Sequence, residues 1–554
     1  MTAQTVRTGV PVAPSSPSSP SALAGTGLLL RFMLRRDRAR LLVPVVSLLV
    51  FCVYYVTATA SLYPTAADRL NRAESISNAG GVLLSGPGYG LDDYTPGAMF
   101  ANEMSLWVMV FLAMSNIFHI TRNTRAEEET GRAELVRSLP VGRHAETVAA
   151  WLVVLIVDAV FGVLACVLIS TVGGLAAVDT CVLVAGMVLT GLVFAAVGTV
   201  TCQLTVYGRG ASGLACALVG AAVLIRGLGD VQQPRGNWVS WLSPIAWTQQ
   251  SRAYVDLRLW PLGLSVAAVV VLGAVAALLA GRRDFGEALV GERAGRADAA
   301  PRLAKPFWFA FRQLRTALLC WMAGCVVMFV LSGAFLGENV GEIADSLASQ
   351  NSLTEKIFAG DPLGAFLRIF LLHCALAVAG FSVAAILRMK GEEEEGRLGL
   401  ELSRPASRTR LLMSRLAVVV LGMLVLLVVG GGVALWAGSL LSHGQIGLGE
   451  LTGCAAAFAP GIAVLIAFAT ACYAWFPRAT PVAWVLFAVV VLESFFGRLL
   501  DLPHAVSALS PFWWVGDYPV SPVDPSHMAG LCVVAAALVA LAVAGFRRRD
   551  LLTG

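Results

Sequence analysis

The chain alternates long apolar runs with short polar segments, and this pattern predicts membrane-spanning helices. A helix needs about 20 predominantly apolar residues to cross a hydrocarbon core roughly 30 Å thick. Runs of this length lie at 41–62, 101–121, 145–174, 180–206, 211–230 and 262–281, and then at 316–336, 364–387, 410–440, 447–476, 479–499 and 527–546. We therefore expect an all-α integral membrane protein with twelve transmembrane helices.

The polar positions are also patterned, because a dense charged insert follows the second apolar run of each half. The first insert extends from Thr124 to Arg143 and the second from Gly391 to Arg408. Four residues of the first recur 265 positions later: Gly131 as Gly396, Arg132 as Arg397, Pro140 as Pro405 and Arg143 as Arg408. A charged insert repeated in register within an apolar protein indicates two homologous halves.

The repeat predicts two six-span halves. We place them at 25–281 and 307–554, joined by a polar connector at 282–306 and preceded by a Ser- and Pro-rich tail, 1–24, whose composition is typical of disorder. An even number of spans per half orients both halves the same way, as parallel repeats forming a pseudo-dimer. Segments 28–40 and 305–312 mix apolar and basic residues, as expected of interfacial elbow helices.

Further landmarks support this repeat. Arg282-Arg-Asp284 recurs as Arg548-Arg-Asp550, directly after the last apolar run of each half. The two occurrences are 266 positions apart, which is close to the spacing of the charged inserts. The repeat therefore extends to the ends of both halves.

Composition agrees with burial in lipid, since 57% of the residues are hydrophobic and only 14% are charged. Soluble proteins average about 25% charged residues. The net charge of +5 gives no reason to expect nucleic-acid binding, and the positions of the basic residues are more informative than their sum. Basic residues precede the first span, fill both inserts and the connector, and close the chain, whereas 500–526 contains neither Lys nor Arg. By the positive-inside rule, both termini and both inserts are cytoplasmic.

The sequence gives no support for a metal site. Its eleven cysteines include no C-x-x-C pair, and its six histidines include no H-x-x-x-H spacing. Cysteines beside apolar runs more often serve as small buried side chains of transmembrane helices.

The charged inserts combine helix-end chemistry with an unusual density of acids. Thr124 and Glu127 fit a capping box, and Gly131 and Gly396 would end or tighten a short helix. One interpretation is a solvated loop with ordinary caps. The repetition of the same Glu-x-Gly-Arg order favours a docking surface for a cytoplasmic partner, in which charges determine register and specificity.

Both inserts fit the pattern E-x-G-R-x-x-L-x-x-S-x-P-x-x-R. This pattern resembles the coupling segment of ABC-2 type exporter permeases, although Arg replaces the usual Thr after each glycine. The doubled, twelve-span form is similar to the actinobacterial subfamily described as exporters of polyketide antibiotics or multidrug efflux permeases. The resemblance covers essentially the whole chain and implies a multi-pass protein of the bacterial plasma membrane.

The resemblance implies that two copies of a cytoplasmic ABC ATPase bind beneath the inserts. The implied contacts are Glu127, Glu128, Glu129, Gly131, Arg132 and Glu134 for one ATPase, and Glu393, Glu394, Glu395, Gly396, Arg397 and Glu401 for the other. This chain contains no G-x-x-x-x-G-K-[ST] phosphate loop. We therefore expect no cofactor and no enzymatic activity in this chain, with ATP and Mg²⁺ bound by the partner.

The resemblance also implies that the second and fifth spans of each half line a central cavity for hydrophobic small molecules. Aromatic and Met side chains suit varied apolar ligands, and polar groups in lipid tend to face the bundle interior. The candidates are Met109, Phe111, Met114, Asn116, Phe118, Phe370, His373 and Phe381. The alternative for each is contact with lipid or packing between helices.

One further hypothesis follows from the repeat. Arg226 and Glu493 lie 267 positions apart, near the outer ends of the fifth and eleventh spans. Pseudo-symmetry would bring these opposite charges toward the axis as an outer gate, together with Asp230 and Arg498. The alternative is that each charge extends independently to the interface.

These features predict the permease subunit of an exporter that moves hydrophobic or amphipathic drugs outward by alternating access. A proton-coupled secondary transporter would need a carboxylate in mid-membrane, for which Asp158 is the main candidate. An exporter of lipids or cell-wall precursors would have a similar cavity composition. A membrane enzyme would need a His, Asp or Glu cluster near one interface, and a non-transporting sensor would share the permease architecture.

Overall fold

The computed structural model describes residues 21–77, 79–284, 286–291, 297–337, 340–341, 361–403, 407–440, 442–444, 446–497 and 503–550. Over these residues the regular secondary structure is helical. The chain divides into a first unit, Met1–Leu70 with Val82–Arg293, and a second unit, Asn71–Gly81 with Ala294–Gly554. Most of the predicted tail lies outside the described residues, as do Pro405 and Arg498.

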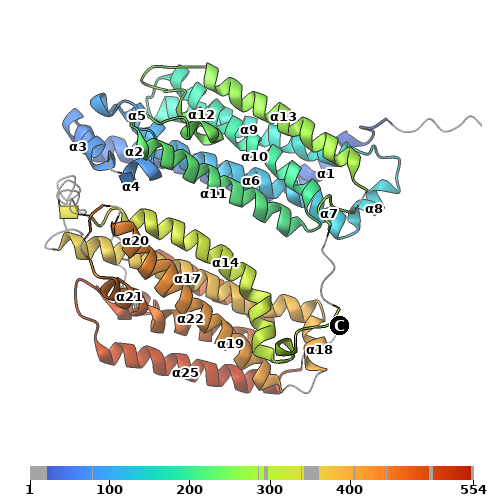
Figure 1. Cartoon of the computed structure of the whole chain (residues 1–554), viewed down its shortest axis with the longest axis vertical. Helices are drawn as coiled ribbons and strands as arrows, with labels where there is room; N and C mark the ends of the chain where they lie inside the picture. The colour runs from blue at the N-terminus through green and yellow to red at the C-terminus, as the bar shows by residue number, and fades with distance from the viewer. Residues whose placement is uncertain are drawn as a thin grey trace, which may run out of the picture. The chain divides into compact units, whose positions relative to one another are not determined.

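Within the described ranges, twelve helices are long and apolar enough to cross a membrane, which confirms the all-α prediction. In the first unit they are α2 (Arg38–Leu62), the continuous helix from α5 (Pro96–Met99) through η2 (Phe100–Met104) and α6 (Ser105–Asn123) to α7 (Arg125–Glu129), α9 (Ala145–Val172), α10 (Ala177–Leu204), α11 (Gly208–Gln232) and α13 (Trp260–Arg282). Figure 1 shows these helices running side by side.

The second unit supplies the other six. They are α14 (Pro306–Gly333), α17 (Pro362–Glu394), the helix formed by α19 (Arg408–Val425), η5 (Leu426–Val433) and α20 (Ala434–Leu440), the helix formed by α21 (Leu448–Ala456) and α22 (Ala459–Trp475), η6 (Pro477–Ala479) with α23 (Pro481–Phe496), and α25 (Pro525–Arg548). Shorter helices are α1 (Thr26–Arg36), α3 (Ala66–Ile76), α4 (Ala79–Leu84), η1 (Leu91–Asp93), α8 (Arg132–Arg137), η3 (Ser240–Leu242), α12 (Pro244–Gln249), η4 (Pro301–Ala304), α18 (Arg397–Leu402), α24 (His504–Ser507) and η7 (Trp513–Val515).

The core of the first unit is built around α6 and α10. The helix containing α6 is 61% buried over its most apolar stretch and α10 is 67% buried, against 11% for α13. Small residues on α10 allow this packing, because a Cβ at Gly191 would lie 3.3 Å from Leu112 Cβ. Small residues at such contacts are typical of helix packing in membranes. The second apolar run is therefore an interior helix.

In the second unit, α17 and α22 occupy the interior, each helix being 61% buried over its most apolar stretch. The neighbouring helix contains a π-helical segment, η5, that includes Gly432. A Cβ at Gly432 would lie 2.7 Å from Thr452 Cα, so glycine permits close approach of the two backbones.

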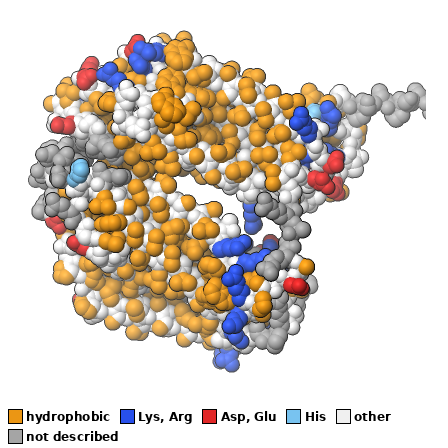
Figure 2. All heavy atoms as spheres, viewed as in Figure 1, with side chains coloured by type: hydrophobic (Ala, Val, Ile, Leu, Met, Phe, Trp, Pro, Cys, Tyr) orange, Lys and Arg blue, Asp and Glu red, His pale blue; other side chains and the backbone are white. Residues whose placement is uncertain are grey.

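The charged inserts lie at helix ends. In the first unit, α7 and α8 lie at the same end as α1, and α12 lies at the opposite end (Figure 1). In the second unit, α18 connects α17 to α19. The expected second elbow at 305–312 is not a separate helix, because residues 306–312 form the first turns of α14. Figure 2 shows hydrophobic side chains over the helix flanks and charged groups toward helix ends.

Candidate functional site

Both inserts fold into the same backbone turn. In the first unit, α7 is followed by Gly131 in the left-handed region, at φ 72°, and then by α8. In the second unit, Gly396 has the same φ of 72° between the end of α17 and the start of α18. Glycine adopts this conformation without the steric cost that a Cβ adds. The sequence repeat is thus also a repeat of local structure.

The predicted capping box at Thr124 is wrong. The Thr124 hydroxyl donates to the carbonyl of Ile120 at 2.7 Å and caps no amide of α7. The physical reason is that Thr124, at φ −126° and ψ −84°, lies outside the backbone geometry of a cap, and its hydroxyl bonds back to the preceding turn of α6. Glu127 instead accepts from Arg36 of α1 at 2.7 Å.

One glutamate, at the same position of the repeat, forms a buried ion pair in each insert with an arginine near the end of the last span. Glu128, whose side chain is 7% exposed, lies 2.7 Å from Arg283 and also 2.6 Å from Arg125. Its equivalent 265 positions later is Glu393, which is 3% exposed and lies 2.6 Å from Arg549. Tyr473 also donates to Glu393 at 2.8 Å. The same contact is therefore built twice, and it fastens each insert to the helix end behind it.

The remaining predicted acids differ in their surroundings. Glu129 accepts from the amide of Gly208 at 2.9 Å, yet it is exposed overall. Glu134 is exposed on α8. Glu394 and Glu395 are both exposed, the first near Lys390 and the second paired with Arg397.

Glu401 is half-buried and does not match the exposed Glu134 of the first copy. It lies 3.2 Å from Arg415 and accepts from Gln313 at 3.3 Å. Burial raises the pKa of Glu401 above its ordinary value, and Arg415 opposes that rise. The acids that face solvent are therefore only part of the predicted set.

Each insert also exposes a large apolar side chain that the sequence analysis did not single out. Leu135 on α8 and Leu400 on α18 are 265 positions apart, and both are 72% exposed. The residues two positions earlier, Ala133 and Leu398, are each 1% exposed. The signal was present in the pattern E-x-G-R-x-x-L, whose Leu is this residue. Each insert thus presents an exposed leucine among charged residues.

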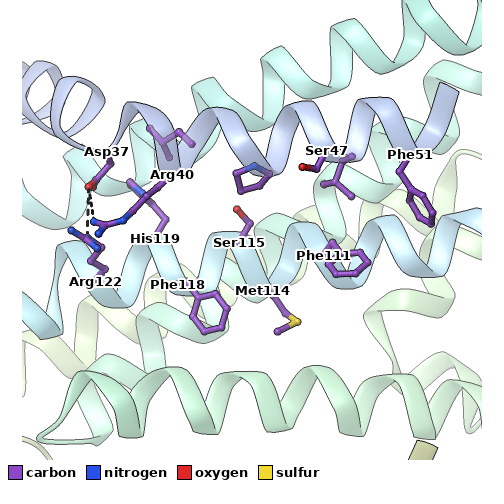
Figure 3. A pocket seen from close by; sticks show the side chains of 13 residues that line it. Asp37, Arg40, Ser47, Phe51, Phe111, Met114, Ser115, Phe118, His119 and Arg122 are labelled. Atoms are coloured by element: carbon purple, nitrogen blue, oxygen red, sulfur yellow. Dashed lines mark ion pairs between the residues drawn. The ribbon is translucent and has the colours of Figure 1, made fainter. Parts of the chain in front are cut away.

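The predicted cavity residues of the second span divide between two faces of α6. Phe111, Met114 and Phe118 line a pocket of about 700 Å³ formed with α2 (Figure 3). Met109 is fully buried in the core. Asn116 donates to Asp158 Oδ2 at 2.7 Å and is also buried. One face of the helix therefore borders a pocket while the other packs the unit together.

The corresponding residues of the second unit are also divided. His373 lines a pocket of about 480 Å³ between α14 and α17. Phe370 stacks on Phe366 with ring centroids 5.9 Å apart, and Phe381 is buried beside Trp321. The described lining residues of both pockets come from the first and second spans of each unit, and none comes from α11 or α23. The central cavity shared by the two halves stays a prediction.

Arg226 is fully buried inside the first unit. It pairs with Asp230 at 3.2 Å and donates to the carbonyls of Val82 and Leu83. Asp230 in turn accepts from Ser240 at 2.7 Å. The predicted contact between Arg226 and Glu493 would join the two units, and it stays a prediction.

Comparison with known proteins decides the family. Residues 303–547 match the family described as "Multidrug efflux system permease Rv1217c, C-terminal domain". The chain is 32% identical over 556 residues to the multidrug efflux system permease protein Rv1217c of Mycobacterium tuberculosis (strain ATCC 25618 / H37Rv), with 98% of each chain covered. The chain belongs to the Rv1217c family of multidrug efflux system permeases.

The regions that match the Rv1217c family include both charged inserts and the His373 pocket. The C-terminal family region contains the second insert, from Gly391 to Arg408, and the His373 pocket. The full-length similarity extends over the first insert as well. The twelve apolar helices found among the described residues, together with this membership, make the chain a multi-pass membrane protein of a permease family.

Proposed function

We propose that this permease is the membrane-spanning subunit of an ABC-2 type exporter that moves hydrophobic or amphipathic compounds out of a bacterial cell. The observation that carries the proposal is the matched pair of inserts, each with a left-handed glycine and a leucine that is 72% exposed. A soluble partner that covers these leucines would remove apolar surface from water. Two matched surfaces call for two copies of one partner.

The proposed partner is a cytoplasmic ABC ATPase, which would bind the ATP and Mg²⁺. The surface offered to it on the first unit consists of Glu129, Arg132, Glu134 and Leu135, which are all exposed. An apolar side chain ringed by charges suits a complementary groove, in which the charges determine register. The proposed orientation, with both termini and both inserts in the cytoplasm, follows from the distribution of Arg and Lys.

The ion pairs of the inserts suggest how partner movement reaches the membrane spans. Glu127 ties the first insert to α1 through Arg36, and Glu128 ties it to the end of α13 through Arg283. In the second unit, Glu393 ties the insert to α25 through Arg549. A displacement of either insert would therefore pull on the ends of neighbouring spans. Closure of two ATPases could in this way drive alternating access.

The proposed substrates are hydrophobic or amphipathic small molecules. The relative is named a multidrug efflux system permease. The composition of the second spans agrees with this class, because Phe, Met and Trp side chains can repack around varied apolar ligands. The proposed export path is the one the sequence resemblance implies, along the second and fifth spans of both halves.

The proposal is tested by co-purification with a co-expressed ABC ATPase, followed by ATP-dependent drug uptake into inside-out vesicles. We expect two ATPases per permease chain. Leu135→Asp combined with Leu400→Asp should abolish both the complex and the uptake, since both leucines are exposed and make no core contact to lose. Leu139→Asp, at another exposed leucine of the first insert, is the matched control. A complex that survives the double substitution would overturn the docking proposal.

A further inference from the structure

The pocket between α2 and α6 of the first unit has a charged end and an apolar body (Figure 3). Asp37, Arg40, His119 and Arg122 gather at the charged end, where α2 begins and α6 ends. The body is lined mainly by Pro44, Phe51, Phe111, Met114 and Phe118. The volume of about 700 Å³ lies in the range of about 300–1,000 Å³ that ligand pockets have. The pocket is thus amphipathic along its length.

The charged end carries more positive than negative charge. Asp37 is the one acid among the described lining residues, and it faces Arg40 and Arg122 at 3.6 Å each. Arg36 also approaches Asp37, at 3.5 Å, but its guanidinium forms a closer pair with Glu127 at 2.7 Å. One carboxylate therefore faces two lining guanidiniums at distances too long for hydrogen bonds. An anion would complement this end of the pocket.

Buried polar atoms at the same end have no hydrogen-bond partner among the described residues. They include His119 Nε2, Asp37 Oδ1 and Arg122 Nε. His119 is only 9% exposed, and Asn123 Nδ2 lies 3.3 Å from its Nδ1. Asn123 Nδ2 also donates to Asp37 Oδ2 at 3.2 Å and to the His119 carbonyl at 3.0 Å. His119 Nε2 is therefore a buried ring nitrogen without a partner among the described residues, and as an N–H it would donate to a ligand oxygen.

We propose that this pocket binds one anionic phospholipid of the membrane. Its phosphate would lie at Arg40, Arg122 and His119, and one acyl chain would lie along the apolar body. The depth fits, because the charged end lies where the apolar spans begin and end, which is the level of lipid headgroups. Basic pockets between transmembrane helices bind anionic headgroups in this way.

The second unit provides an internal comparison. Its pocket between α14 and α17 has no Lys, Arg, Asp or Glu among the described lining residues. That pocket should therefore show no preference for an anionic lipid. The inference is independent of the ATPase partner, and it assigns Phe111, Met114 and Phe118 to lipid contact rather than to an exported drug.

The test is native mass spectrometry of the purified full chain, equilibrated with phosphatidylglycerol or with phosphatidylcholine of the same acyl chains. The wild type should retain phosphatidylglycerol in preference to phosphatidylcholine. Arg40→Gln with Arg122→Gln should weaken phosphatidylglycerol retention by about fivefold for each arginine removed. Ser115→Trp, which fills the body of the pocket, should exclude lipid without changing the charge.

The matched control is Arg209→Gln with Arg282→Gln, which removes the same charge from exposed positions of the first unit outside the pocket. This control variant should retain the wild-type lipid preference. Arg122→Lys is a second test in case the Arg40→Gln, Arg122→Gln variant does not fold; because it keeps the cation, it should also retain the preference. Equal retention of both lipids, or an equal loss in the control, would overturn the proposal. Since neither ATPase nor transport is measured, failure here is separate from failure of the exporter proposal.

Discussion

At the residue scale, the acids of the inserts have two distinct roles. Glu128 and Glu393 are buried against Arg283 and Arg549, so they hold the fold together. Glu129, Glu134, Glu394 and Glu395 are exposed and available to a partner. A buried charge that loses its partner is costly, whereas an exposed charge is not. Substitutions of neighbouring glutamates should therefore have very different effects.

Arg283→Ala should lower the stability of the permease by about 2 kcal/mol, because Glu128 loses its contact with Arg283 at 2.7 Å and keeps only Arg125, at 2.6 Å, as a partner. Arg282→Ala, at the exposed neighbouring position, should have little effect. The measurement is thermal unfolding in detergent, with Glu128→Ala and the double variant completing a mutant cycle. Additive losses in that cycle would show that the pair contributes no coupling energy.

Glu401 predicts a pH dependence. Its folded pKa is raised by burial above the ordinary value of about 4.5, so the folded state binds the proton more tightly than the unfolded state. The stabilising contribution is complete below about pH 4.5 and is lost as the pH rises through the raised pKa. The unfolding temperature of Glu401→Gln minus that of the wild type should therefore increase when the pH is raised from 4.5 to 8.

The control for that measurement is Glu134→Gln, an exposed acid of the first insert that should show no such trend. If the advantage of Glu401→Gln instead shrank as the pH rose, the contact with Arg415 would outweigh burial.

At the element scale, the two inserts share a backbone turn but differ in chemistry. The first carries exposed Glu134 on α8, whereas α18 has Gly399 at that position and half-buried Glu401 two residues later. Arg36 of α1 holds the first insert, whereas Arg415 of α19 contacts Glu392 and Glu401 in the second. The two docking surfaces are therefore similar in shape but unequal in charge.

Single substitutions should separate the two inserts. Leu135→Asp alone and Leu400→Asp alone should each leave a complex with one ATPase per permease chain, because each unit presents its own exposed leucine. The stoichiometry is measured by light scattering of the purified complex. Loss of both ATPases from either single variant would instead indicate that the ATPases bind as a preformed pair.

At the scale of the whole molecule, the source of energy separates the main proposal from a proton-coupled transporter. Asp158 is the carboxylate that a proton-coupled mechanism would use, and it is 1% exposed inside the first unit. It accepts a hydrogen bond from Asn116 at 2.7 Å between α6 and α9. This placement is typical of a polar contact between packed helices.

Asp158→Asn should therefore retain ATP-dependent uptake within about twofold, since the amide oxygen can accept the same hydrogen bond from Asn116. Uptake into inside-out vesicles is measured with ATP and, separately, with an imposed proton gradient. Asp256→Asn, at an exposed acid, is the control. Uptake driven by the gradient alone and abolished by Asp158→Asn would favour the secondary-transporter alternative.

The sequence by itself determined the twelve spans, the two-fold repeat and the turn at Gly131 and Gly396, because apolar run length and glycine position act over a few neighbouring residues. Tertiary structure alone decided which glutamates are buried. Glu128 and Arg283 are 155 residues apart in the chain, and their contact depends on α7 lying beside the end of α13. The charged end of the lipid pocket likewise required α2 and α6 to bring Asp37 to Arg122. Periodicity assigns side chains to helices, but only packing decides which helix faces meet.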